Sequence, residues 1–454
     1  MRLAWLGTLF VSYQIVASVL VATTAFAQEV LIEEGATQRT FIAPLADKGP
    51  FREAIERLKK FNSPGNKMAP VEMPELGISL VTGTFSSTEA NLLLSEGYQE
   101  PVSFEVSLFA NGFCEGKSRP LAAASDDSFV PPSVCRVAGP PVPPPSGPKI
   151  WIIDSGVDEH AVARGLLNVQ DRINCMVTPC DDTVASLPDK NGHGTMVAGI
   201  VGGMRVQDGN GYLGIVGVSP GVPLMIVKAF EGEKSRMLGP PALALQYVRD
   251  HADSGDILSI SWGAEFMQVT KRGGRLDKLG EMDKYLFQIA DKPVRIVIAA
   301  GNARGDDDPS WVQSFFPANA AEYVSPSNAM QGFIWSVSAS ESTFNSTTPG
   351  PCRGVTGWCD ALWTGGSFGA TRAEPGIDIH VLDKSKSASE FRRNICSGTS
   401  LAAPLLAGLL ARDAATSPPL TTAIKGGVLT DTDQVGFRTT GTPAGVASDF
   451  PTCN

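Results

Sequence analysis

Ser400 stands where a tight turn leads into an apolar helical segment. The turn is Ser397-Gly-Thr-Ser-Leu-Ala-Ala-Pro404, and leucine dominates residues 405–410. Pro404 fits the first turn of a helix, where a missing N–H costs little. A hydroxyl at that place lies beside unpaired N–H groups and the positive end of the helix dipole, which would stabilise an oxyanion. An ordinary capping serine shows the same pattern, so the segment marks Ser400 only as a candidate nucleophile.

A serine hydroxyl is weakly acidic and needs a neighbouring base to act as a nucleophile. The chain has four histidines, and three of them, His160, His251 and His380, lie in sequences without distinctive features. His193 lies between glycines in Asn191-Gly-His-Gly-Thr195, at the start of a segment of small residues. Because glycines leave the approach to the imidazole open, His193 is the candidate base.

Asp154 is the candidate carboxylate that would orient this base. It closes the apolar run Ile150-Trp-Ile-Ile153 and is followed by Ser155-Gly-Val157. A buried parallel strand has this composition, and functional groups of open α/β sheets gather at the carboxyl ends of the strands. In chain order the three candidates are an aspartate, a histidine and a serine, which is the order found in subtilisin.

Four blocks resemble the signature sequences of the subtilisin-like serine proteases, the subtilases. They are Asp154-Ser-Gly-Val, Asn191-Gly-His-Gly-Thr-x-Val-Ala-Gly, Ser397-Gly-Thr-Ser-x-Ala-x-Pro and Val297-Ile-Ala-Ala-Gly-Asn302. The resemblance covers about residues 149–440 and leaves the first third of the chain unexplained. It implies that Ser400 attacks a peptide carbonyl, that His193 transfers the proton, and that Asp154 orients the imidazole.

The resemblance also implies a substrate cleft. Asn302 would complete the oxyanion hole with its side-chain amide. Ser261-Trp262-Gly263 and Ala300-Gly301 match the two segments that border the cleft in subtilases. An extended protein or peptide substrate would pair with such strand edges through its main chain. A catalytically inactive binding scaffold is the alternative, but such a scaffold would be marked by loss of a triad member, and the sequence retains all three.

Composition and the first residues predict a secreted protein, either extracellular or periplasmic. The net charge of −10 argues against a nucleic-acid partner, and eight cysteines indicate an oxidising compartment. Residues 1–27 read as a signal peptide, with Arg2 before an apolar stretch and a small-residue site at Ala25-Phe-Ala27. After cleavage of the signal peptide, no membrane-spanning segment is expected in the protein. A retained membrane anchor is the alternative, because the apolar stretch is almost long enough to span a bilayer.

Residues 28–138 predict a smaller α+β region. Apolar residues recur at helical spacing over 51–61, whereas 77–85 and 102–109 alternate as strands do. Residues 139–148 contain six prolines and predict an extended linker before the catalytic domain, 149–454. The resemblance implies that residues 28–138 are a pro-region, which would contact the catalytic domain. The cut is expected near the linker, because the linker is exposed and lies directly before the first strand of the catalytic domain. A permanent docking or adhesion domain is the alternative.

The catalytic domain is expected to be α/β, with a parallel sheet covered by helices on both faces, as in subtilases. Strand-like apolar runs alternate with helical patterns. The runs cover 150–153, 224–227, 257–260, 295–300 and 334–337. Between the third and the fourth of these runs, one helix face is marked by Leu276, Leu279, Met282, Leu286 and Ile289.

No redox or organic cofactor is expected, and structural calcium is left open. The loop 208–220 resembles a subtilase loop that often binds calcium, but Gly211 replaces the usual amide ligand. The acidic run 306–308 indicates a solvated loop, with a site for a cation or basic substrate as the alternative.

Local spacing suggests disulfide bonds rather than a zinc site, because no Cys-x-x-Cys pair occurs. The preferred pairing, one of 105 possible pairings of eight cysteines, joins Cys175 to Cys180, Cys352 to Cys359 and Cys114 to Cys135. This pairing leaves Cys396 and Cys453 over.

Overall fold

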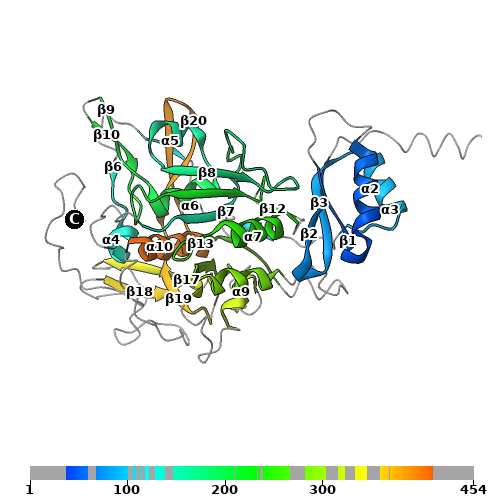
Figure 1. The fold of residues 1–454 in the computed structure, drawn as a ribbon. Coiled ribbons are helices and arrows are strands. Elements are labelled where there is room, and N and C mark those ends of the chain that lie inside the picture. The colour runs from blue at the N-terminus through cyan, green and yellow to red at the C-terminus, as the bar shows by residue number, and fades with distance from the viewer. Residues whose placement is uncertain are drawn as a thin grey trace, which may run out of the picture.

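A computed structural model describes most of the catalytic region and much of the region before it (Figure 1). The described residues are 37–59, 68–100, 106–108, 114, 118–121, 128–138, 147–209, 211–232, 234–235, 239–265, 282–302, 315–322, 333–344, 358–363, 365–367 and 369–412. Among them, no helix is long and apolar enough to cross a membrane. The predicted signal peptide, the helix positions Leu276 and Leu279, the acidic run 306–308 and most of the Pro-rich linker lie outside this part.

A largely parallel sheet forms the centre of the predicted catalytic domain. Its strand order is β18-β17-β15-β13-β7-β11-β8, with β19 beside β17. These strands are β7 (Ile150–Asp154), β8 (Val169–Asn174), β11 (Leu224–Lys228), β13 (Ile257–Ile260), β15 (Arg295–Ala299), β17 (Ile334–Phe344), β18 (Trp358–Leu362) and β19 (Arg372–Pro375). Of these strands, β18 pairs antiparallel. Each predicted apolar run is therefore a strand, and the expected α/β fold is confirmed.

Helices cover both faces of this sheet. Helices α6 (His193–Gly202) and α10 (Thr399–Arg412) pack on each other and on the sheet, as do α7 (Gly239–His251) and α9 (Asp283–Asp291). Successive side chains of a strand point to opposite faces. Trp151 of β7 lies near Tyr247 of α7, whereas Asp154 contacts His193 of α6. The two helix pairs therefore lie on opposite faces of the sheet. Asp154, the last residue of β7, lies on the face that α6 covers.

Residues 37–99 form a small unit with its own core (Figure 1, blue). Its antiparallel sheet has the order β1-β3-β2 and is covered by two helices. The elements are β1 (Thr37–Pro44), α2 (Lys48–Lys59), β2 (Val71–Met73), β3 (Ile78–Phe85) and α3 (Ser87–Ser95). Phe41, Phe51 and Phe85 are fully buried in this core. The predicted α+β character of this stretch is confirmed.

The other face of that small sheet docks on the catalytic domain. Ile42 and Leu80 belong to the core of the catalytic domain, and β3 packs on α7. Across the interface, Glu75 forms an ion pair with Arg249 of α7, with 2.6 Å between Oε1 and Nη1. Tyr285 donates its phenol to the same carboxylate. Burial, and then the charge of Glu75, raise the pKa of Tyr285, which keeps the phenol protonated and able to donate.

Two threonines, Thr82 and Thr178, also join the small unit to the catalytic domain. The N–H of Thr82 donates to the hydroxyl of Thr178 over 3.2 Å, and that hydroxyl donates back to the Thr82 carbonyl. Ala69 donates its N–H to the Thr178 carbonyl. The small unit is therefore held by apolar packing together with backbone and charged contacts.

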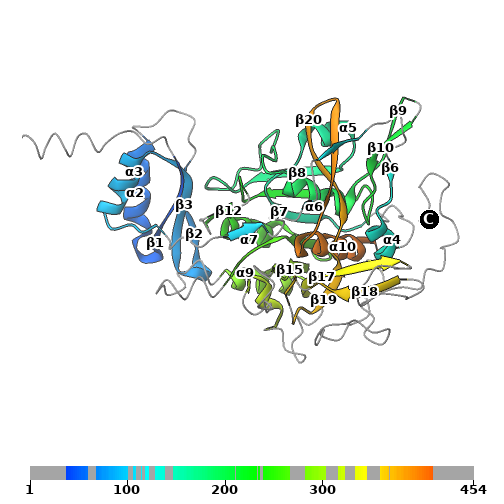
Figure 2. The ribbon, with the colours of Figure 1, turned by 180° about the vertical axis from the view of Figure 1, so that it is seen from behind.

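The described residues between 106 and 138 do not belong to the small unit. Their elements are β4 (Val106–Leu108), β5 (Arg119–Pro120), β6 (Ser128–Phe129) and α4 (Pro132–Ala138). Each strand pairs within the catalytic domain: β4 with β12 (Lys234–Ser235) and β14 (Trp262–Glu265), β5 with β21 (Glu390–Cys396), and β6 with β10 (Gly211–Ile215). Helix α4 packs on α10 and β19 (Figure 2). The boundary between the small unit and the catalytic domain therefore lies before residue 106. The sequence had placed this boundary at the Pro-rich linker, 139–148.

The disulfides differ from the local pairing that the sequence suggests. Cys175 and Cys180 are bonded, as predicted. Cys114 is bonded to Cys396 and not to Cys135, so that prediction is wrong. The physical reason is that β5 pairs antiparallel with β21, which ends at Cys396, and Cys114 forms a backbone bridge with Cys396 itself. Cys135 is disulfide-bonded too, to none of these four cysteines, and the pairing of Cys352, Cys359 and Cys453 lies outside the described side chains.

Candidate active site

Asp154 and His193 are in direct contact. The Nδ1 atom of His193 lies 2.8 Å from Oδ1 and 3.0 Å from Oδ2 of Asp154. Both side chains are buried, with exposed fractions of 0% for Asp154 and 2% for His193. Ser155 donates its N–H to Asp154 Oδ1 over 2.8 Å, which holds the carboxylate at the end of β7. The contact fixes the plane of the imidazole and favours a proton on Nδ1.

Two glycines make this contact possible. Gly194, the second residue of α6, lies so close to the loop after β7 that a Cβ there would be 2.2 Å from the Gly156 carbonyl oxygen. Gly156 itself has φ +114°, in the region that glycine favours. The small residues of these two motifs therefore allow α6 to approach β7 closely enough for His193 to reach Asp154.

Asp189 organises the turn before α6, a role that the motifs in the sequence did not indicate. Its carboxylate accepts hydrogen bonds from the hydroxyl of Ser155 and from the N–H of Gly192. It also accepts from the N–H and the hydroxyl of Thr195, at 2.8 and 2.7 Å. One buried carboxylate thus joins the residue after Asp154 to both flanks of His193. The available signal was an aspartate closely followed by Asn-Gly, a sequence typical of turns.

Ser400 is the second residue of α10 and is fully buried. Within the part of the chain that the structure describes, its hydroxyl has no hydrogen-bond partner. Its carbonyl accepts a hydrogen bond from the hydroxyl of Ser261 over 3.0 Å. Two residues separate the end of β21 from the start of α10. Helix α10 packs on α6, the helix that begins at His193.

Asn302 is clamped to the residue before Ser400. Its Oδ1 accepts from the N–H of Thr399 at 3.0 Å and from the Thr399 hydroxyl at 2.9 Å. The same hydroxyl accepts from the N–H of Gly301 over 3.2 Å. Because Oδ1 is engaged on the Thr399 side, the NH₂ group of Asn302 is directed away from Thr399. A donor held in this way beside Ser400 suits an oxyanion.

The residues expected to border the cleft are bonded through their backbones to neighbouring strands. Trp262 and Gly263 lie in β14, whose backbone pairs with Leu108 and Ser107 of β4. Ala300 is fully buried and donates its N–H to the Val337 carbonyl in the sheet.

The space above Gly301 is filled by an aromatic side chain. A Cβ on Gly301 would lie 2.5 Å from Cγ of Phe315, and Gly301 has φ +101°. The absence of a side chain at Gly301 therefore accommodates Phe315 as well as the left-handed turn.

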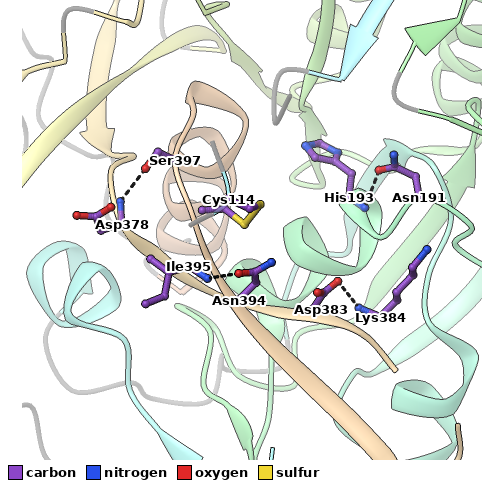
Figure 3. The surroundings of a disulfide bond; sticks show 10 residues. Cys114, Asn191, His193, Asp378, Asp383, Lys384, Asn394, Ile395 and Ser397 are labelled. Atoms are coloured by element: carbon purple, nitrogen blue, oxygen red, sulfur yellow. Dashed lines mark hydrogen bonds between the residues drawn. A yellow bond between two sulfur atoms is a disulfide. The ribbon is translucent and has the colours of Figure 1, made fainter. Parts of the chain in front are cut away.

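The Cys114–Cys396 disulfide lies next to this site (Figure 3). In the view of Figure 3 it is drawn between Ser397 and His193. Ser397 accepts a hydrogen bond from the N–H of Asp378, which holds the turn before α10 from the other side. A covalent bond therefore fixes the end of β21 directly before the turn that carries Ser400.

The loop that resembles a calcium site has other contacts. Asp208 ends β9 (Val206–Asp208), which forms a hairpin with β10, and its carboxylate pairs with Arg164 at 2.6 Å. Across the described ranges, no group of three or more His, Cys, Asp or Glu side chains could hold a metal ion.

A sequence model of the subtilase family matches residues 145–433, more than half of the chain. The chain belongs to the subtilase family. The four motifs, and the α/β sheet that carries them, fall inside the matched part. The match excludes the small unit at 37–99 and the segment 106–138.

Individual relatives of this subtilase are distant. Subtilisin-like protease 2 of Plasmodium falciparum is 26% identical over 181 residues, which cover 37% of this chain and 12% of that protein. Alkaline elastase YaB of Bacillus sp. (strain YaB) is 24% identical, covering 59% of this chain and 54% of the relative. Serine protease AprX of Bacillus subtilis (strain 168) is 24% identical, covering 61% and 58%. The chain thus spans less than two thirds of each of these relatives.

Among solved structures, the S41 psychrophilic protease is 22% identical, with a TM-score of 0.43 over 65% of this chain and 86% of that one. Sphericase is 21% identical, with a TM-score of 0.43 over 64% and 85%.

Proposed function

We propose that this subtilase is a secreted serine endopeptidase that hydrolyses peptide bonds in proteins or peptides. Ser400 is the nucleophile, His193 the general base and acid, and Asp154 the carboxylate that orients the imidazole. Asn302 and the N–H of Ser400 hold the oxyanion. Family membership and the names of the relatives, two of them called proteases and one an elastase, support the reaction class.

The reaction proceeds in two halves. Ser400 Oγ attacks the scissile carbonyl while His193 takes its proton, and the oxyanion forms next to the NH₂ group of Asn302. His193 then gives the proton to the leaving amine, and the C–N bond breaks to leave an acyl group on Ser400. Water, deprotonated by His193, attacks this ester. The carboxyl product leaves, and Ser400 regains its proton.

The observation that carries the proposal is the buried contact of Asp154 with His193. A buried carboxylate against Nδ1 stabilises the imidazolium that forms when Nε2 accepts a proton, and it leaves Nε2 as the basic nitrogen. Hydrogen bonds from Thr399 hold the side chain of Asn302, so its NH₂ group is a fixed donor. Such a donor stabilises the negative charge that develops on the carbonyl oxygen without reorganisation during the reaction. A scaffold that only binds peptides would need neither feature.

Secretion is supported by two disulfides between described cysteines, at Cys114–Cys396 and Cys175–Cys180. Such bonds persist in oxidising compartments. The signal peptide at residues 1–27 remains a prediction from sequence.

Active-site labelling tests the proposal. A serine-directed organophosphorus reagent should modify one serine, and peptide mapping should place it at Ser400, because only an activated hydroxyl reacts rapidly. The Ser400→Ala variant should stay unlabelled. Ser389→Ala, which removes an exposed hydroxyl on the hairpin of β20 (Ile379–Ser387) and β21, is the matched control and should label as the wild type does. Labelling of another serine in the wild type would contradict the assignment.

A further inference from the structure

The ring of Phe315 packs directly on Gly301, the residue before Asn302. A Cβ added to Gly301 would lie 2.5 Å from Cγ, 2.6 Å from Cδ2 and 2.7 Å from Cδ1 of Phe315. All three distances are well inside van der Waals contact, so the ring occupies the place that a side chain at 301 would take. Phe315 is buried, with an exposed fraction of 4%, which shows that its ring is packed between neighbours.

A short strand holds Phe315 in this place. Strand β16 (Phe315–Phe316) pairs antiparallel with β14, with Phe315 opposite Glu265 and Phe316 opposite Ala264. Strand β14 itself begins with Trp262, in the segment expected to border the cleft. The residue that contacts Gly301 is therefore fixed by the backbone to the other segment expected at the cleft.

Gly301 is held against the ring, because both of its backbone polar groups are bonded. Its N–H donates to the hydroxyl of Thr399 over 3.2 Å, and its carbonyl accepts from the hydroxyl of Ser367 over 3.0 Å. Moving Gly301 away from the ring would break these buried hydrogen bonds, which is costly. Thr399 also bonds to Asn302. The ring, Gly301 and the proposed oxyanion donor thus form one connected wall.

A substrate brings one side chain against this wall. During attack, the scissile carbonyl carbon lies at Oγ of Ser400 and its oxygen at the NH₂ group of Asn302. The side chain on the acyl side of the scissile bond is attached to the carbon next to this carbonyl, so it must lie close to the residues that flank Asn302. A glycine at 301 would leave open space for that side chain, but Phe315 fills this space.

We propose that Phe315 is a specificity-determining residue, which limits cleavage to peptide bonds that follow glycine, alanine or serine. A branched or aromatic side chain on the acyl side of the bond would have to displace the packed ring, and such overpacking is unfavourable. This inference rests on the proposed function and adds the class of substrate to it.

A set of peptide substrates tests the inference on the secreted wild-type enzyme. The fluorogenic peptides share one sequence and differ in the residue before the scissile bond, which is Gly, Ala, Ser, Leu or Phe. The kcat/KM for the Ala peptide should exceed that for the Leu or Phe peptide at least about tenfold, because one methylene in a pocket already changes kcat/KM by about 10–200-fold. A kcat/KM for the Leu or Phe peptide within about tenfold of the Ala value would overturn the inference.

Mass spectrometry of a casein digest reads the same preference from natural bonds. The new carboxyl termini should be mainly glycine, alanine or serine, and a majority of leucine or aromatic termini would contradict the role of Phe315. In that case casein is still cut, so the endopeptidase assignment stands. Intact casein together with an unlabelled Ser400 after organophosphorus treatment would instead refute the proposed function.

A variant of Phe315 assigns the preference to its ring. Phe315→Ala should raise kcat/KM for the Phe peptide relative to the Ala peptide by at least about tenfold, because the filled space is opened. Phe391→Ala is the matched control. It removes another buried phenylalanine, on β21, and should leave this ratio unchanged. An unchanged ratio in Phe315→Ala would show that another group sets the preference.

Phe315→Val keeps the test independent of folding. Truncation to alanine leaves a cavity that destabilises the domain, whereas valine refills part of the cavity and suits a strand. The Phe315→Val enzyme should shift the ratio of the Phe to the Ala peptide in the same direction as Phe315→Ala. A folded Phe315→Val enzyme with the wild-type ratio would count against the inference.

Discussion

Gly194 packs against the carbonyl of Gly156 more closely than any residue with a Cβ could. This approach sets the separation of helix α6 from the loop after β7, and hence the contact of His193 with Asp154. A methyl group at 194 would push the two elements apart, because the obstacle is backbone and cannot rotate away.

We therefore predict that Gly194→Ala lowers kcat by about 10²-fold or more, since misplacing a catalytic group by about 1 Å has that effect. Overpacking should also destabilise the domain by roughly 1–3 kcal/mol. Gly232→Ala, where no atom lies within 4 Å of the added Cβ, is the control in the same domain. Steady-state kinetics and thermal unfolding measure both effects, and a Gly194→Ala enzyme as active as the control would refute this role of Gly194.

Asp189 should act as a positioning residue. Asp189→Asn replaces one acceptor oxygen by an NH₂ group that faces donors, which costs about 1–3 kcal/mol at a buried site. The loop that carries His193 should loosen, so kcat should fall while KM changes little. Asp253→Asn, on an exposed ion pair with Lys149, is the matched control. If both variants lose the same activity, the Asp189 network has no special role in placing His193.

Asn302→Leu should lower kcat by about 10²–10³-fold, the usual effect of losing one oxyanion donor. KM should move little, because the contact strengthens in the transition state. Thr399→Val should have a smaller effect, since the Thr399 N–H still holds Asn302 Oδ1. A rise in KM at constant kcat would make Asn302 a ground-state binding residue instead.

Glu75→Ala should weaken docking of the small unit, because it removes the acceptor of Arg249 and Tyr285. Charge-assisted hydrogen bonds of this kind contribute about 1.5–3 kcal/mol. The Ser400→Ala background is used because the small unit is expected to stay covalently attached there, and amide exchange in α7 should become at least about tenfold faster. Glu53→Ala, on an exposed part of α2, should leave exchange in α7 unchanged. Unchanged exchange in the Glu75 variant would show that the apolar patch alone holds the unit.

The central strands could be predicted because burial on both faces demands continuous apolar runs, as in Ile150–Asp154. Strand β8, Val169–Asn174, was missed because its polar sequence is that of an edge strand with partly exposed side chains. The triad candidates could be found from local motifs, because turns and small residues must accompany them.

Long-range pairing was the part that could not be predicted from sequence. Strands β5 and β6 are each two residues long, too short to give a sequence pattern. They are strands because their backbones pair with β21 and β10. For the same reason, Cys114 is bonded to Cys396 across 282 residues rather than to the nearby Cys135. The role of Asp189 depends on donors that converge only after folding.

The most direct test of the central claim is the hydrolysis rate of Ser400→Ala on a fluorogenic peptide, measured on protein free of host proteases. We predict that kcat falls by about 10⁴–10⁶-fold, because nucleophile and base act as one unit. Ser389→Ala should keep the wild-type rate. Retention of more than about a tenth of wild-type activity by Ser400→Ala would contradict the assignment of Ser400 as the nucleophile.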